Sequence, residues 1–135
     1  MIKKIEEGVA NIMQHYGFGQ AEAKIMASLA VNGEMSAKEL AGYTGYAYST
    51  VINVLNFLSR MGFIKKYKKG KLSIYSANID FVRMMENERK RLIDILNDLK
   101  KNINGVKNNY KKRLSNLIIK VEDLLEYMKK NEEAI

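Results

Sequence analysis

The sequence predicts a mostly α-helical protein with one small β-hairpin, followed by a long helical C-terminal region. Three observations predict this fold class. Apolar residues recur every three or four positions along most of the chain, as they do in amphipathic helices. Residues 63–76 depart from this spacing and form two β-rich runs around a glycine. Finally, none of the 135 residues is proline, which favours long uninterrupted helices.

Two helices are expected first, over residues 2–15 and 20–31. The first carries an apolar stripe at helical spacing, and the two glycines within residues 16–19 end it. The second combines Ile25 and Leu29 with several alanines, which suggests close packing against neighbouring helices. The stripe on the first helix consists of Ile2, Ile5, Val9 and Ile12.

A capping box starts the third helix, which is expected over residues 36–43. The Ser36 hydroxyl can accept a hydrogen bond from the Glu39 N–H, while the Glu39 carboxylate reaches back to the Ser36 N–H. Gly45 then permits a tight turn, and a fourth helix follows over about residues 47–61. The apolar face of this helix holds Val51, Leu55 and Leu58.

Two β-rich runs, residues 63–67 and 72–76, flank a loop of hairpin length, Lys68-Lys69-Gly70-Lys71. The order of helix, helix, tight turn, helix and basic hairpin is typical of a winged helix-turn-helix. In such a fold the fourth helix enters the major groove of DNA. The hairpin, called the wing, then contacts the adjacent phosphates or the minor groove.

The fourth helix has a polar face opposite its apolar one, and basic residues follow it in the wing. Asn53 on the polar face can pair bidentately with adenine, whereas lysines bind phosphates without reading the sequence. Residues 36–80 hold seven basic and two acidic residues, a net charge of +5 within a total of +8, which suits a polyanionic partner. The predicted contacts to double-stranded DNA are Ser36, Tyr46, Tyr48, Ser49, Thr50, Asn53, Asn56, Arg60, Lys65, Lys66, Lys68, Lys69 and Lys71.

From residue 80 onward, apolar positions are spaced mostly three and four residues apart, as in a coiled coil or helical bundle. We therefore expect residues 1–79 to form a DNA-binding domain and residues 80–135 a dimerisation region. Asparagines and a glycine between residues 102 and 109 leave two alternatives: one helix of about 75 Å, or a helical hairpin, which we slightly prefer. The residues predicted to pair two copies are Leu92, Leu96, Leu99, Ile103, Val106, Tyr110, Leu114, Leu117, Val121, Leu124 and Met128.

The composition excludes several other kinds of site. Cysteine is absent and His15 is the single histidine, which excludes disulfides, thiolate chemistry and multi-histidine metal centres. The carboxylates of the C-terminal region have no nucleophile or metal partner, so we expect no enzymatic activity and no cofactor. No apolar run reaches the roughly 18 residues of a membrane span, and the N-terminus is charged too early for a signal peptide, so a cytoplasmic protein is expected. A small-molecule effector has no support in the sequence.

Four short motifs, Tyr16–Lys24, Ser36–Ala41, Thr44–Tyr46 and Ser49–Val51, carry a resemblance to a known family. They are similar to the TrmB-like winged-helix regulators, which are related to MarR- and GbsR-type regulators. The resemblance covers about residues 8–76 and implies a dimeric transcriptional regulator that reads promoter DNA with its fourth helix and wing.

The chain departs from this family in three respects. Ala47 is a poor N-cap for the fourth helix, and the helix lacks an early arginine, which weakens the expectation of guanine readout. Only helices follow the wing, so the sugar sensing of longer relatives is not carried over.

One competing interpretation is a winged-helix adaptor that binds a partner protein through its C-terminal helices. The adaptor predicts a stable protein complex and no salt-sensitive DNA binding, whereas a regulator predicts DNA binding that weakens with salt. A membrane-surface role for the C-terminal region is disfavoured, because its basic residues alternate with acidic ones.

Overall fold

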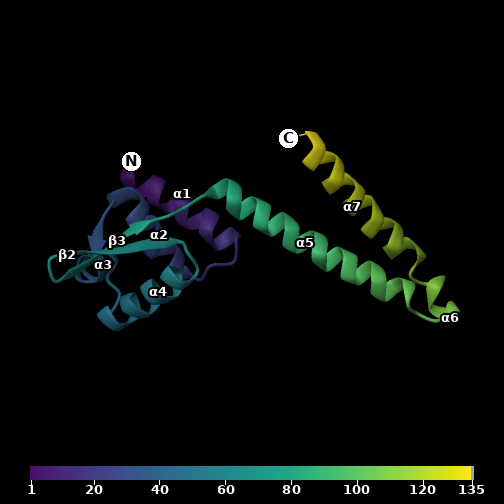
Figure 1. Cartoon of the computed structure of the whole chain (residues 1–135), viewed down its shortest axis with the longest axis horizontal. Coiled ribbons are helices and arrows are strands. Elements are labelled where there is room, and N and C mark those ends of the chain that lie inside the picture. The colour runs from purple at the N-terminus through teal and green to yellow at the C-terminus, as the bar shows by residue number, and fades with distance from the viewer. Residues whose placement is uncertain (135) are drawn as a thin grey trace. The chain divides into compact units, whose positions relative to one another are not determined.

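The computed structural model describes the backbone of residues 1–134 and the side chains of residues 1–130, and it divides into two compact units, Met1–Asp80 and Phe81–Ile135 (Figure 1). The first unit contains α1 (Ile2–His15), α2 (Gln20–Asn32), β1 (Met35–Ser36), α3 (Ala37–Thr44), α4 (Tyr48–Arg60), β2 (Ile64–Lys69) and β3 (Leu72–Ala77). The second contains α5 (Phe81–Asn104), α6 (Asn108–Lys111) and α7 (Ser115–Ala134). Among these helices, none is both long and apolar enough to cross a membrane.

The core of the first unit is built around α2, which contacts α1, α3, α4 and β3. The side chains of Ile25, Met26 and Leu29 on this helix are at most 1% exposed. The helix is short and rich in alanine, so its neighbours can approach closely on several sides. The largest other side chains buried with it are Met13, Leu40, Val51, Leu55 and Leu58.

The apolar stripe predicted on α1 faces solvent over much of its length. Ile2, Ile5 and Ile12 are 56%, 50% and 41% exposed, whereas Met13 is fully buried and anchors the helix to the core. Helical spacing identified one apolar face of α1, but Met13 on a neighbouring face is the residue that packs inside the unit.

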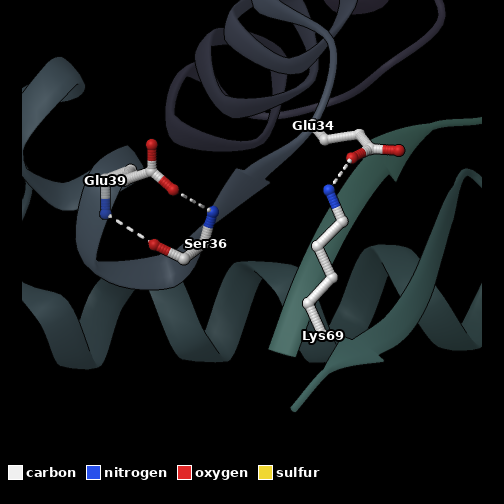
Figure 2. A network of polar contacts seen from close by, with 4 residues as sticks. All are labelled: Glu34, Ser36, Glu39 and Lys69. Atoms are coloured by element: carbon white, nitrogen blue, oxygen red, sulfur yellow. Dashed lines mark hydrogen bonds and ion pairs between the residues drawn. The ribbon is translucent and has the colours of Figure 1, made fainter. Parts of the chain in front are cut away.

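The capping box at the start of α3 is confirmed. The Glu39 N–H donates to the Ser36 hydroxyl and the Ser36 N–H donates to the Glu39 carboxylate, both at 3.1 Å (Figure 2). The other end of α3 is closed by Gly45, whose φ of +80° lies in the left-handed region that favours glycine. The short α3 is therefore fixed at both ends, which determines where α4 begins.

The sheet has three strands in the order β1-β3-β2, and both pairings are antiparallel. Residues 68 and 69 belong to β2, so the predicted four-residue loop is in fact a two-residue turn, Gly70-Lys71. Gly70 has a φ of +63°, which suits the first position of a tight hairpin turn. The sequence did not reveal β1, because two residues are too short to show an alternating pattern.

The second unit is a helical hairpin, as we slightly preferred, and the alternative of one long helix is wrong. The chain leaves the helical conformation after Asn104, at Gly105, and α7 packs back against α5. Leu96, Ile103 and Val121 are buried between the two helices, and four half-buried residues pack around them. These four are Leu114, Ile118, Leu125 and Met128.

Part of the predicted seam between copies has a partner within the same chain. Antiparallel helices that fold back in this way bury their own apolar stripes, so several seam residues pack against one another between α5 and α7. Their pairing between two copies stays a prediction. These seam residues are Leu96, Ile103, Leu114, Val121 and Met128.

Candidate nucleic-acid interface

The two faces of α4 differ sharply in exposure. Val51, Leu55 and Leu58 are fully buried, and they hold α4 against the core. The face pointing away from them carries hydroxyl, amide and guanidinium groups, which suit hydrogen bonds to base edges and phosphates. The side chains on this face that lie exposed are Ser49, Asn53, Asn56 and Arg60.

The N-terminus of α4 has no side-chain cap, because Ala47 has no group that can accept a hydrogen bond. The N–H groups of a first helical turn otherwise point toward solvent and attract anions such as phosphate. Tyr48, the first residue of α4, is 57% exposed beside them. Ala47, which the sequence identified as a poor N-cap, thus leaves the N-terminus of α4 without a side-chain acceptor for its N–H groups.

A groove of about 700 Å³ joins the exposed part of α4 to the wing. Tyr48 and Asn56 line it from α4, and Lys66 and Lys71 line it from the hairpin. Lys38, on α3, also lines this groove although it was not among the predicted contacts. Its position two residues after the capping serine was the signal that could have identified it, because side chains in the first turn of α3 project beside α4.

The five wing lysines are all exposed, but they do not share one environment. Neighbouring residues of a strand point to opposite faces, so Lys66 and Lys68 share one face of β2 while Lys65 and Lys69 share the other. The Lys66 ammonium lies 5.9 Å from the centre of the Tyr75 ring, the residue directly opposite it on β3. The pairing register therefore directs Lys66 into the groove beside α4.

Lys69 is paired with an acidic residue from outside the wing. Its ammonium lies 3.0 Å from the carboxylate of Glu34, which precedes β1 (Figure 2). The sequence showed no acidic residue among the wing lysines, but the sheet brings Glu34 next to them. The carboxylate of Glu34 therefore neutralises part of the positive charge of the wing.

Ser36, a predicted DNA contact, lines the groove beside α4 but is only 4% exposed. Its hydroxyl accepts the capping hydrogen bond from the Glu39 N–H. A hydroxyl used as an N-cap has little capacity left to bind a phosphate. The structure therefore gives Ser36 a role in starting α3, and its contact with DNA stays a prediction.

Tyr46 and Thr50 lie at the edge of the interface and are half-buried. The Lys24 ammonium is 5.3 Å from the centre of the Tyr46 ring and donates a hydrogen bond of 3.2 Å to the Thr44 carbonyl. Lys24 thus fixes the turn between α3 and α4 from the side of α2. Sequence reasoning missed this residue, because its two partners are about twenty positions away.

The comparisons with known proteins were made against families, curated proteins and solved structures. Residues 13–79 match the family described as "Sugar-specific transcriptional regulator TrmB". None of the curated proteins matches the chain.

Solved structures share the fold at low sequence identity. TrmBL2, an archaeal chromatin protein, aligns with 87% of this chain and 45% of its own, at 19% identity and a TM-score of 0.63. A structure described as that of a transcriptional regulator aligns with 96% of this chain and 94% of its own, at 12% identity and a TM-score of 0.57. The family match identifies the chain as a TrmB-like transcriptional regulator, and the shared architecture shows its winged-helix fold.

Proposed function

We propose that this protein is a homodimeric transcriptional regulator that binds double-stranded DNA in a sequence-specific manner. In this proposal α4 lies in the major groove, and the β2–β3 wing contacts the backbone or the minor groove. The single observation that carries it is the groove in which Tyr48 and Asn56 of α4 lie beside Lys66 and Lys71 of the wing. An amide that could read a base edge and ammonium groups that could bind phosphates thus line one groove.

The similar fold of TrmBL2 adds support, because the description of that protein states that it binds DNA. The two contributions expected from this chain differ in kind. Lysines on the wing neutralise phosphates and give affinity for any duplex, whereas Asn53 and its neighbours on α4 give preference for particular base pairs.

Dimerisation is the second part of the proposal, and one side of the α5–α7 hairpin supports it. A groove lined by Asn97, Lys100 and Glu122, together with Ile93 and Leu125, runs along one side of the hairpin. By helical phase, large apolar side chains from both helices lie on the opposite side and are 37–64% exposed. They are Leu92, Ile95, Leu99, Leu117, Leu124 and Tyr127.

A second copy of this chain is the occupant we propose for that apolar side. Pairing two copies places two α4 helices on one DNA molecule, and half-sites about 34–36 Å apart suit such a dimer. In this arrangement the unit Met1–Asp80 binds DNA and the unit Phe81–Ile135 holds the copies together.

Selection of bound duplexes from a random pool, followed by affinity measurements at several salt concentrations, tests the proposal. The double variant Lys68→Ala with Lys71→Ala should bind every duplex more weakly. Its slope of log K against log salt should fall by about 1.8, at about 0.9 for each lost phosphate contact.

The matched control is Lys3→Ala with Lys4→Ala on α1, which removes the same charge from exposed positions outside the groove. Binding that is insensitive to salt, or no duplex enriched over random DNA, would rule out the proposed function. A stable complex with another protein in its place would favour the adaptor.

A further inference from the structure

One ion pair connects the wing to the segment that leads into the sheet. The Lys69 ammonium lies 3.0 Å from the Glu34 carboxylate (Figure 2). Lys69 is the last residue of β2, and Glu34 directly precedes β1. Because β3 lies between β1 and β2, this side chain reaches from one edge strand to the start of the other edge strand.

The pair sets Lys69 apart from the remaining lysines of the wing. Within residues 1–130, the structure pairs no carboxylate with Lys65, Lys66, Lys68 or Lys71. Lys66 and Lys71 line the groove beside α4, whereas Lys69 does not and lies on the opposite strand face from Lys66. Lys69 is therefore directed toward Glu34 and away from the proposed DNA surface.

Both partners are largely exposed, with 64% of the Lys69 side chain and 49% of the Glu34 side chain accessible. An exposed ion pair contributes little to folding stability and is screened by salt. On the proposed function, the pair would act on the charge that the wing presents to DNA. A lysine that neutralises a phosphate releases a condensed counterion from DNA, whereas a lysine already neutralised by a carboxylate does not.

We propose that Glu34 is a positioning residue that holds Lys69 away from the DNA backbone and limits how many phosphates the wing neutralises. This inference rests on the proposed DNA-binding function. Phosphate contacts carry no sequence information, so Glu34 lowers the affinity for all duplexes by a similar factor. The base contacts of α4 then account for a larger share of the total binding.

The test compares the full-length Glu34→Gln variant with Glu7→Gln, measured by fluorescence anisotropy on a random duplex over a range of salt concentrations. Glu7 is an exposed glutamate on α1, so its variant makes the same change in net charge. Glu34→Gln should steepen the slope of log K against log salt by about 0.9 and raise the affinity at low salt several-fold. Glu7→Gln should change neither quantity appreciably.

Repeating the comparison in a Lys69→Gln variant isolates the role of Lys69. With Lys69→Gln in place there is no ammonium to release, so adding Glu34→Gln should have no larger effect than adding Glu7→Gln. Thermal unfolding of each variant checks that the fold is retained.

Two failures are distinguishable in this experiment. Equal salt slopes for Glu34→Gln and Glu7→Gln, in a protein that binds DNA, would overturn this inference alone. A wild-type protein without salt-sensitive binding to any duplex would overturn the proposed function and this inference with it.

Discussion

The hydroxyl of Tyr43 on α3 donates a hydrogen bond of 2.7 Å to the carboxylate of Glu6 on α1. The other oxygen of that carboxylate lies 3.2 Å from the hydroxyl of Ser28 on α2, a fully buried residue whose single proton is shared with the Lys24 carbonyl at 2.7 Å. Glu6 therefore links three helices through polar contacts. These contacts add to the buried Met13 in holding α1 against the core, although Ile2 and Ile5 remain exposed.

Replacing Tyr43 with phenylalanine should lower the free energy of unfolding by about 1 kcal/mol, less than the usual value of about 1.5–3 kcal/mol for a hydrogen bond to a charged group, because the contact is exposed to solvent. Urea unfolding of the variant measures this loss. DNA affinity should be unchanged, because Tyr43 lies outside the groove beside α4. Tyr67→Phe is the control, because the Tyr67 hydroxyl has no hydrogen-bond partner among the residues that the structure describes, and it should not lower the free energy of unfolding.

Replacing Lys24 with methionine should loosen the turn between α3 and α4, because the Thr44 carbonyl loses its donor and the Tyr46 ring loses its cation. We expect a loss of about 1 kcal/mol in the free energy of unfolding. Affinity should fall for selected and random duplexes alike, since α4 is displaced as a whole. Unchanged amide hydrogen exchange in residues 44–50 would contradict this role for Lys24.

Replacing Asn53 with alanine should weaken binding to selected duplexes by about 1–3 kcal/mol, the usual discrimination of one bidentate base contact. Binding to random duplexes should change little, because no phosphate contact is removed. Asn11→Ala, at an exposed asparagine on α1, is the matched control. Equal losses on selected and random DNA would show that Asn53 does not read bases.

Replacing Leu96 with alanine should lower the free energy of unfolding of the second unit by about 2–5 kcal/mol. Leu96 is 8% exposed and packs with Ile103 and Val121 between α5 and α7, so truncation leaves a cavity there. Chemical unfolding followed by circular dichroism measures the loss. A change below about 0.5 kcal/mol, the range of surface substitutions, would contradict the hairpin core.

Replacing Leu124 with glutamate should separate the two copies of the proposed dimer while leaving the hairpin folded, because Leu124 is 38% exposed on the apolar side of the hairpin. Light scattering of the purified variant at several concentrations measures the mass. The control is Ile119→Glu, which changes an exposed apolar residue on a different face of α7. Equal masses for wild type and both variants would rule out this dimer surface.

The local elements of the first unit were predictable because their signals lie within a few residues. The Ser36–Glu39 capping box depends on groups three positions apart, and Gly45 supplies the positive φ that ends α3. The polar face of α4 follows from the helical repeat alone. For the same reason, the tight turn at Gly70 could be located within one or two residues.

Contacts between residues far apart in the chain were decided by the tertiary structure. Lys69 meets Glu34 only because β3 pairs with both β1 and β2, and no local pattern records that pairing. Apolar spacing in the C-terminal region showed that Leu96 and Val121 are buried, but the same spacing suits a partner in another chain or in the same one. Because the chain reverses at Gly105, α7 covers the apolar stripe of α5 within the same chain and no second copy is needed to bury it.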